Sequence, residues 1–520
     1  MANGFNSTDY KLQKTSVAFK TADTELKSYY DIAEAHLKEN ETVYNDKRLI
    51  KEGATYPNVW LETQPMGGEH YAKRNIEVGF NNILIFLQYQ RRDGRFPGMI
   101  GREPREENGV VAFFDWMQGY YFLQPALRMY YITGKDESYL RKLYHAAKDF
   151  DAYLWSTRDS NGDGCLESWC PWDTGEDNCT RMLNFGAEDG CFGGDVPPKG
   201  IGKLPYQSME YMAYSYANRY NLAIISEMLG LDEKEYWLSE AEKVRERVKE
   251  YLWDDERKAC FDRDCDGVTI NNLSHTNLRC MYHRLFDREM AEAFMEKHLF
   301  NPDEFYTPTP FPANAINDPF FKNDKNNNWS GPCQGLIYQR SIDALHNYGH
   351  YTEALDIGRS VIRLIKGSKG QFYQQWDPIT GEHGNGLDGY GPMIFAFTEY
   401  ISYLCGVNFA YDEVFFSSVS DIADSSYTQN IIGKSYRLDR ENGNMTAYLD
   451  GAEIFKASAG LRVVTDVDGR VIKVICIEKG IDTASVTIDG KTYTGSVQPN
   501  GVYALNNGKL ELIAAEKCYV

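Results

Sequence analysis

The chain runs Ala126-Leu-Arg-Met-Tyr-Tyr-Ile132, then Thr133-Gly-Lys-Asp136, then Glu137-Ser-Tyr-Leu-Arg-Lys-Leu-Tyr-His-Ala-Ala-Lys-Asp-Phe-Asp-Ala-Tyr-Leu154. Apolar residues recur in both outer stretches at the spacing of one helix face, and the short polar stretch between them is a helix-ending turn. The same pattern of two consecutive helices returns twice more, at residues 213–230 with 233–252 and at residues 335–348 with 352–365. Because the intervening segments lack regular β-branched strands, these pairs predict a mainly α fold, an α/α toroid, rather than a parallel sheet.

From about residue 411 the pattern changes to short stretches that alternate between apolar and polar residues, with frequent Asp-Gly turns. These stretches are Met445-Thr-Ala-Tyr-Leu-Asp-Gly451, Leu461-Arg-Val-Val-Thr-Asp-Val-Asp-Gly469, Val471-Ile-Lys-Val-Ile-Cys-Ile477 and Ser485-Val-Thr-Ile-Asp-Gly490. Such stretches are typical of hairpin strands, so we expect a β-sandwich-like domain of roughly 100 residues. The predicted division is a helical catalytic domain over residues 1–410 and a C-terminal β-domain over residues 411–520.

Charge and composition exclude several classes of partner. The 520 residues include 55 Lys and Arg against 75 Asp and Glu, a net charge of -20 that repels phosphate backbones and anionic lipids. We therefore expect no nucleic acid and no membrane partner. The N-terminus shows no basic start followed by an apolar run, which favours a cytoplasmic location. The 11 cysteines have irregular spacing and no Cys-x-x-Cys, which predicts reduced thiols rather than a disulfide framework or a zinc ribbon.

One polar loop gathers carboxylates and indoles. Arg158-Asp-Ser-Asn-Gly-Asp-Gly-Cys-Leu-Glu167 precedes Trp169 and Trp172, and Asp173-Thr-Gly-Glu-Asp-Asn-Cys-Thr-Arg181 follows. A glycosidic oxygen leaves only when it is protonated, and Asp177, between a glycine turn and polar neighbours, is a candidate proton donor. The tryptophans offer flat apolar faces on which a pyranose can stack. The loop therefore predicts a sugar-cleaving site.

Five segments between residues 60 and 407 also carry a resemblance, namely Leu123–Gly134, Arg158–Glu167, Asp173–Cys179, Asn328–Pro332 and Tyr348–Ala354. In this order they are similar to segments of the clan of inverting glycosidases that includes glycoside hydrolase family 63 and the trehalases. The third segment resembles the clan's Glu-Ser-Gly-Trp/Met-Asp-Asn-Ser, which implies that Asp177 is the general acid. The resemblance also implies an (α/α)6 barrel, inverting exo-hydrolysis of an α-linked, gluco-configured saccharide or glycoside, a small carbohydrate as the partner, and no cofactor.

The chain departs from that clan at the second catalytic position. The clan's Glu-x-Tyr-Asn-Pro-x-Thr-Gly corresponds to Gln374-Gln-Trp-Asp-Pro-Ile-Thr-Gly-Glu382, so the base position holds Gln374. A glutamine does not accept a proton at neutral pH. Three readings compete: a substitution introduced to trap a ligand, a different carboxylate as base (Glu382, Asp377 or Glu69), or a protein that binds sugar without cleaving it. A further departure is Glu176, whose negative charge is expected to raise the pKa of its neighbour Asp177.

The remaining candidates for sugar contact lie in four other places: Glu69, His70 and Tyr71 in the glycine-rich stretch Pro65–Tyr71, the pair Asp115 and Trp116, the residues Asp173 and Arg181, and the loop tryptophans Trp329 and Trp376. Each has an ordinary alternative. The glycine-rich stretch also reads as a solvated turn before a helix. Asp115 also reads as a buried helix cap, and Arg181 as the ion-pair partner of Asp173.

Two Asp-rich turns resemble the start of a calcium loop, at Asp159–Gly164 and Asp262–Gly267, but the twelfth loop positions are Cys170 and Leu273 instead of a bidentate Glu. We expect no metal, with calcium left open at the first turn. Two further classes of function also stay open: another (α/α)6 enzyme, such as a rhamnosidase-like hydrolase or a disaccharide phosphorylase, and a non-catalytic sugar-binding protein. Nothing in the pattern bears on the oligomeric state.

Overall fold

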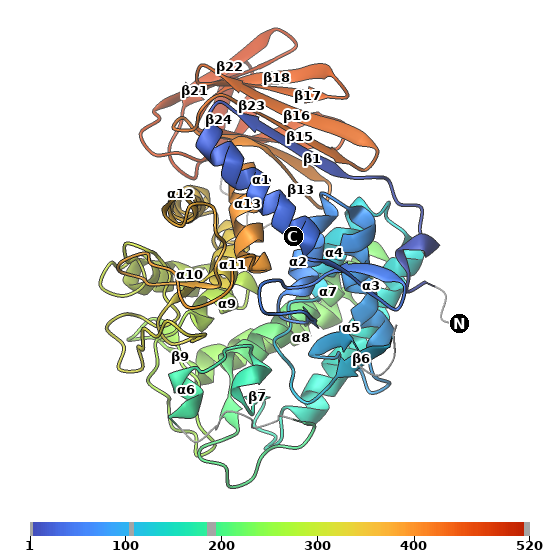
Figure 1. The fold of residues 1–520 in the computed structure, drawn as a ribbon, viewed down its shortest axis with the longest axis vertical. Helices are drawn as coiled ribbons and strands as arrows, with labels where there is room; N and C mark the ends of the chain where they lie inside the picture. The colour runs from blue at the N-terminus through green and yellow to red at the C-terminus, as the bar shows by residue number, and fades with distance from the viewer. Residues whose placement is uncertain (1–3, 103–108, 185–193, 514–520) are drawn as a thin grey trace.

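The computed structural model describes residues 4–102, 109–184 and 194–513. A helical body carries most of the chain, and a β-sheet covers one end of it (Figure 1). The helices are α1 (Thr24–Glu39), α2 (Gln64–Ala72), α3 (Ile76–Tyr89), α4 (Leu123–Ile132), α5 (Glu137–Thr157), α6 (Thr180–Leu183), α7 (Met209–Met228), α8 (Lys234–Tyr251), α9 (Thr276–Tyr282), α10 (Arg288–Phe294), α11 (Gly335–His346), α12 (Tyr351–Gly367) and α13 (Gly391–Cys405).

The predicted helix pairs are confirmed as α4 with α5, α7 with α8, and α11 with α12. The turn between α4 and α5 shows why the first pair forms. Gly134 takes a φ of 94°, which suits glycine, and the Asp136 carboxylate accepts a hydrogen bond from the Tyr139 N–H at 3.1 Å, which caps α5. The predicted fold class, a mainly α toroid of paired helices, is confirmed.

The C-terminal part forms the predicted β-domain, and all four predicted strands are present. Its strands are β13 (Val407–Ala410), β14 (Glu413–Ser418), β15 (Ser425–Ile431), β16 (Lys434–Glu441), β17 (Asn444–Leu449), β18 (Ala452–Ser458), β19 (Leu461–Asp466), β20 (Val471–Cys476), β21 (Thr483–Ile488), β22 (Lys491–Ser496), β23 (Val502–Asn506) and β24 (Lys509–Ile513). They belong to one hydrogen-bonded sheet of 13 strands.

The thirteenth strand of this sheet comes from the other end of the chain. β1 (Ser16–Thr21) pairs antiparallel with β15, from Ser16 opposite Asn430 to Thr21 opposite Ser425, and is the blue strand beside β15 in Figure 1. β1 and β13 both precede residue 411 in the sequence yet belong to the sheet. The division of the chain at residue 410 into two domains stays a prediction.

Short strand pairs fix the loops of the helical body: β2 (Glu41–Tyr44) with β3 (Lys47–Ile50), β4 (Val59–Trp60) with β5 (Met99–Arg102) and β6 (Val110–Phe113), β7 (Glu167–Ser168) with β8 (Tyr206–Gln207), β9 (Trp253–Asp254) with β10 (Ala259–Cys260), and β11 (Cys333–Gln334) with β12 (Gln375–Trp376). These pairs determine the paths of the loops that build the site.

Apolar packing joins the sheet to the helices. Leu355 of α12 and Leu404 of α13 are buried in one cluster with Phe415, Val464 and Ile475 of the sheet. Because β13 begins two residues after α13 ends, the sheet lies at the C-terminal end of that helix, and the loop before Gly391 lies at the opposite end. No helix in the described ranges is both long and apolar enough to cross a lipid bilayer.

Candidate active site

The loop that carries Asp177 is anchored by a fully buried ion pair. Arg158 and Asp173 are both 0% exposed, and Arg158 Nη1 lies 2.7 Å from Asp173 Oδ2. The Asp173 carboxylate also accepts from the backbone N–H of Met117 at 3.1 Å and of Trp169 at 2.9 Å. The Arg158 guanidinium stacks on the Trp169 ring at 3.7 Å. Asp173 therefore joins the Asp177 loop to the segment around Met117 instead of contacting substrate.

Gly175 lets the Asp177 loop approach the segment that carries Glu62, on the other side of the site. Its φ of 74° favours glycine, and an added Cβ would lie 2.0 Å from Glu62 Oε2. The close approach places the Glu62 carboxylate against the backbone two residues before Asp177. A side chain at this position would push the two walls of the site apart.

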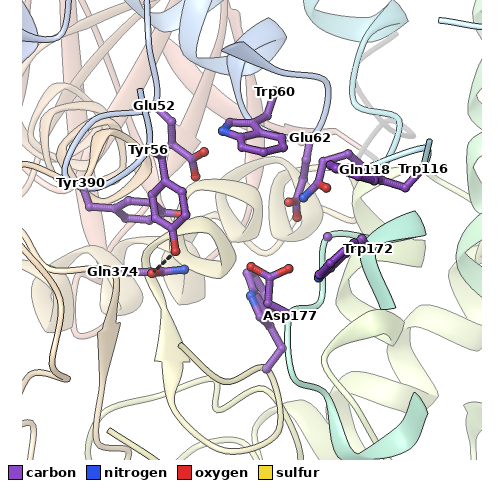
Figure 2. A pocket seen from close by; sticks show the side chains of 12 residues that line it. Glu52, Tyr56, Trp60, Glu62, Trp116, Gln118, Trp172, Asp177, Gln374 and Tyr390 are labelled. Carbon is purple, nitrogen blue, oxygen red and sulfur yellow. Dashed lines mark hydrogen bonds between the residues drawn. The ribbon is translucent and has the colours of Figure 1, made fainter. Parts of the chain in front are cut away.

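Asp177 belongs to a chain of hydrogen bonds that crosses the site. Asn327 Nδ2 donates to Asp177 Oδ2 at 2.7 Å, and Gln374 Nε2 donates to Asn327 Oδ1 at 3.1 Å. The Tyr56 hydroxyl donates to Gln374 Oε1 at 2.9 Å, the dashed line in Figure 2. Asp177 is half-buried, and the Trp329 backbone N–H donates to its backbone carbonyl at 3.1 Å. The predicted acid and the predicted base position therefore lie in one network.

These residues line a pocket of about 260 Å³, a volume that suits a single sugar ring better than an extended ligand. Its lining consists of indoles, tyrosines, carboxylates and amides: Glu52, Tyr56, Trp60, Glu62, Trp116, Gln118, Trp172, Gly175, Asp177, Trp329, Gln374 and Tyr390. Trp116 and Trp172 meet edge to face, with ring centroids 5.2 Å apart. The Trp60 indole N–H is buried and has no protein acceptor among the described residues.

A second, more polar hollow of about 400 Å³ adjoins the first and shares Tyr56 and Gln374 with it. Thr55, Lys325 and Asn385 contribute to its wall. The Tyr56–Gln374 pair therefore stands between two spaces, one walled by indoles and one by amides.

Two lining carboxylates were not predicted. Glu52 follows β3 in the loop 51–58, and Glu62 follows β4; they are 6% and 4% exposed. Burial raises the pKa of Glu62 to about 7, against the opposing charges of Arg340 and Arg279. Burial and the Glu62 charge raise the pKa of Glu52 well above its ordinary range. Each of the two glutamates had a weak signal in the sequence. Glu52 stands next to the turn residue Gly53, and Glu62 stands two residues after Trp60.

The structure brings five of the predicted site residues together in the pocket: Trp116, Trp172, Asp177, Trp329 and Gln374. The others lie elsewhere. The stretch Pro65–Tyr71 is not a turn but part of helix α2. A Cβ on Gly68 would meet Asn82 Cβ at 2.6 Å, so the glycines allow α2 to pack closely on α3.

The three predicted α2 residues have protein partners instead of a place in the pocket. Glu69 lies 3.5 Å from Arg128 Nη1, and burial raises its pKa to about 7. Burial lowers the pKa of His70 to about 4, and Tyr71 donates its hydroxyl hydrogen bond to Glu41. Glu69 is therefore no base for this pocket.

Arg181 pairs with Glu176 and Asp262, so the expected pair with Asp173 is wrong. Asp173 belongs instead to Arg158, as described above. Glu176 is 2% exposed and also accepts from Thr276 Oγ1 at 3.0 Å. Burial by itself would raise the pKa of Glu176, but the guanidinium groups of Arg181 and Arg279 outweigh it and lower this pKa to about 2.

Of the remaining candidates, Trp376 is 1% exposed in β12, and Asp115 is exposed and caps no helix. The Glu382 side chain is 65% exposed and lies 3.0 Å from Lys325 Nζ. Asp377 accepts from the N–H groups of the turn that follows it, at 2.8 Å each. None of these residues lines the pocket, so neither of the two carboxylates proposed near position 374 is placed to act as its base.

The Asp-rich turns are held by their own hydrogen bonds. Asp264 Oδ1 accepts from the N–H groups of Asp266 and Val268, both at 2.9 Å, and Asp159 Oδ1 accepts from the Gly164 N–H at 3.3 Å. Within the described ranges, no group of three or more His, Cys, Asp and Glu side chains is arranged to hold a metal ion. Nine cysteines lie in these ranges and form no disulfide; Cys191 and Cys518 lie outside them.

Known structures share this fold. A family 63 mannosylglycerate hydrolase from Thermus thermophilus, solved with glucose, matches with a TM-score of 0.58 and 17% identity over 72% of this chain and 99% of that one. The neutral trehalase of Saccharomyces cerevisiae matches with 0.54 and 14% over 72% and 80%. An α-L-rhamnosidase from Dictyoglumus thermophilum matches with 0.54 and 13% over 91% and 48%. At these identities the likeness shows the fold alone.

A search of curated protein sequences finds no match. A family model does match, over residues 66–393, and this range includes Trp116, Trp172, Asp177, Trp329 and Gln374 but begins after Glu52 and Glu62. The match spans well over half of the 520 residues. The chain therefore belongs to the mannosylglycerate hydrolase MGH1-like glycoside hydrolase family.

Proposed function

We propose that the chain is an inverting, exo-acting glycosidase that removes a gluco-configured sugar from an α-linked saccharide or glycoside, with Asp177 as the general acid. The observation that carries the proposal is the position of Asp177. It lies in a pocket the size of one sugar ring, between indole walls, in a chain that belongs to a glycoside hydrolase family. A pocket of this size favours removal of a terminal unit over cleavage within a chain.

The proposed reaction has two coupled proton transfers. The sugar ring stacks between Trp60 and the Trp116–Trp172 pair, and its scissile bond lies at Asp177. The Asp177 carboxyl gives its proton to the glycosidic oxygen as the bond from that oxygen to the anomeric carbon breaks. Water attacks the opposite face of the ring, so the anomeric configuration inverts. Asn327, which donates to Asp177 Oδ2, fixes the direction in which the acid points.

The leaving group would occupy the polar hollow beside the pocket. That hollow meets the pocket at Tyr56 and Gln374, and its amides and Lys325 offer hydrogen bonds to hydroxyl or carboxylate groups. Gln374 itself is neutral and hydrogen-bonded at both ends of its amide. It therefore positions groups in the site but takes no proton.

The first test is product analysis by NMR on a panel of glycosides. The panel contains trehalose, α-glucosides, mannosylglycerate and α-rhamnosides, each incubated with and without phosphate. Release of the β-anomer of glucose from an α-glucoside supports the proposal. Turnover of mannosylglycerate alone would instead show that this chain has the activity for which the Thermus thermophilus mannosylglycerate hydrolase is named.

Three other outcomes favour the alternatives. Turnover of α-rhamnosides alone would favour a rhamnosidase-like hydrolase, the group whose structure matches 91% of this chain, β-domain included. Phosphate-dependent turnover would favour a phosphorylase. Saturable sugar binding without any turnover would favour a binding protein.

The acid is tested by Asp177→Asn. We expect kcat on an unactivated glycoside to fall by about 10² to 10⁴, the usual contribution of a general acid. The matched control is Asp115→Asn, the same change at an exposed carboxylate outside the pocket, which we expect to leave kcat unchanged. Equal losses in both variants would exclude a specific role for Asp177.

A further inference from the structure

An inverting site needs a second carboxylate across the sugar from the acid. Position 374 cannot supply it, because the Gln374 amide is neutral and is hydrogen-bonded to Tyr56 and Asn327. Among the described residues that line the pocket, two carboxylates remain besides Asp177, namely Glu52 and Glu62. The identity of the base is therefore a choice between these two.

Glu62 is committed to arginines. Arg340 Nη2 lies 3.1 Å and Arg279 Nη2 3.4 Å from its Oε1, and its Oε2 lies against Gly175. A carboxylate oxygen that already accepts from two guanidinium groups is poorly available to a water proton. Glu62 is better suited to act as a fixed anion that accepts from sugar hydroxyls.

Glu52 occupies the side of the pocket where the expected base is missing. Figure 2 shows its carboxylate pointing into the pocket beside Tyr56 and Tyr390, on the same side as Gln374, whereas Glu62 lies on the other side. The Tyr390 hydroxyl acts on the Glu52 carboxyl to lower its pKa, against burial and the Glu62 charge, which raise it. A tyrosine hydroxyl orients a carboxylate but brings no counter-charge to it.

The backbone around Glu52 is held firmly. The Gly391 N–H donates to the Glu52 carbonyl at 2.8 Å, and the Glu52 N–H donates to the Asn58 carbonyl at 3.2 Å. Gly53 turns at a φ of 95°, and a Cβ there would lie 2.5 Å from the Gly389 carbonyl oxygen. Residue 52 is therefore fixed against the N-terminus of α13, as a base with a defined position must be.

We propose that Glu52 is the general base of this site, in place of residue 374. This inference rests on the proposed function. One Glu52 oxygen accepts a proton from the attacking water while the water oxygen bonds to the anomeric carbon. At the same time the Asp177 proton moves to the glycosidic oxygen and the old bond breaks. Glu52 ends protonated and Asp177 ionised, and exchange of one proton through solvent restores both.

The high pKa of Glu52 agrees with this role, since a raised pKa makes the ionised carboxylate a stronger base than an exposed one. Glu52 also lies outside the range 66–393 of the family match. The acid and the glutamine thus come from the matched range, and the proposed base comes from the segment before it.

The test uses the glycosyl fluoride of whichever sugar the parent chain releases. Fluoride leaves without protonation, so Asp177→Asn should retain most of its turnover on this substrate, whereas Glu52→Gln should lose about 100-fold or more. Azide should then restore turnover of Glu52→Gln and give the glycosyl azide of inverted configuration, because an anionic nucleophile needs no base. Glu250→Gln, the same change at an exposed carboxylate of α8, is the matched control.

Two further variants keep the test decisive if Glu52→Gln folds poorly. Glu52→Asp keeps the carboxylate and should retain part of the turnover, and Gln374→Glu should restore turnover when combined with Glu52→Gln. Turnover that survives Glu52→Gln, or azide rescue of Glu62→Gln instead, would overturn the base assignment alone. A parent chain that turns over neither glycoside nor fluoride, or that retains configuration, would overturn the proposed function and the base with it.

Discussion

The Arg158–Asp173 pair gives the sharpest prediction about stability. Each oxygen of the Asp173 carboxylate accepts from two N–H groups. Oδ1 accepts from the Met117 N–H at 3.1 Å and from Arg158 Nη2 at 3.3 Å. Oδ2 accepts from Arg158 Nη1 at 2.7 Å and from the Trp169 N–H at 2.9 Å. In Asp173→Asn, whichever way the amide rotates, its NH₂ group faces two donors.

The size of the effect follows from this geometry. The variant loses two hydrogen bonds and removes the carboxylate charge that faces a guanidinium that is 0% exposed. Removing one partner of a buried pair costs about 3 to 5 kcal/mol. An unfolding entropy of about 2 cal/mol/K per residue over about 400 residues gives about 0.8 kcal/mol/K. A loss of about 4 kcal/mol therefore lowers the Tm by about 5 °C.

The assay is a thermal scan of the parent, Asp173→Asn and the double variant Arg158→Met/Asp173→Asn at one scan rate. Because Met is apolar and uncharged, the double variant removes the buried cation together with the carboxylate charge and should melt above the single one. Since the pair anchors the loop of Asp177, kcat should also fall in Asp173→Asn. The reasoning would be refuted if the Tm of Asp173→Asn lay within about 1 °C of the parent, because that is only a small part of the expected shift. It would also be refuted if the double variant were less stable than the single one.

Three other outcomes follow from the pocket. Because the base must be ionised, and burial and the Glu62 charge raise the pKa of Glu52 well above its ordinary range, kcat/KM should rise at a pH well above the one at which an ordinary glutamate ionises. Glu62→Gln removes a charge that raises the pKa of Glu52, so the pH–rate profile of this variant should rise at lower pH, and an unmoved profile would contradict the coupling. Trp60→Phe replaces an indole of the pocket wall by a smaller ring, so KM should rise about 2- to 12-fold, the factor for about 0.5 to 1.5 kcal/mol of aromatic contact, and an unchanged KM would mean that Trp60 does not stack on the sugar. Asn327→Ala removes the donor that orients Asp177, so kcat on glycosides should fall more than kcat on the glycosyl fluoride; equal losses would point to a general distortion instead.

The sequence predicted a structural feature correctly where the residues that determine it are neighbours in the chain. The helix pair around Gly134 and Asp136 was predictable because the turn and the cap lie within a few residues. The loop 169–179 was predictable because its indoles, glycine and acids follow one another in the sequence. Signals failed where packing between segments decides. Gly67 and Gly68 suggested a turn, yet both lie in a helix, where Gly68 allows the close approach of α3 and Gly67 faces Phe395 of α13.

Long-range pairing was invisible for the same reason. β1 pairs with a strand that begins at Ser425, and no local pattern specifies so distant a partner. Asp173 and Arg181 are close in sequence and oppositely charged, but each meets a different ion. Glu52 and Glu62 looked like any charged residue near a turn. Only the fold shows that both are buried against the same pocket.

The proposed position of the base also accounts for the glutamine. Tyr56, which donates to Gln374 Oε1, is itself raised in pKa by burial and by the charges of Glu52 and Asp177, so all four groups lie within electrostatic reach. A carboxylate at 374 would add a like charge to a pocket that already holds Glu52, Glu62 and Asp177, and would raise the pKa of Glu52 further.

The effect of Gln374→Glu should therefore change sign with its background. In the parent it adds repulsion and leaves Glu52 protonated to a higher pH, so kcat/KM at neutral pH should fall. Once Glu52→Gln has removed the carboxylate on that side of the pocket, none remains there among the described lining residues. The carboxylate added at position 374 then supplies the base, so kcat/KM should rise. A gain in both backgrounds would show that 374 is the better position for the base and that Glu52 merely fills the space beside it.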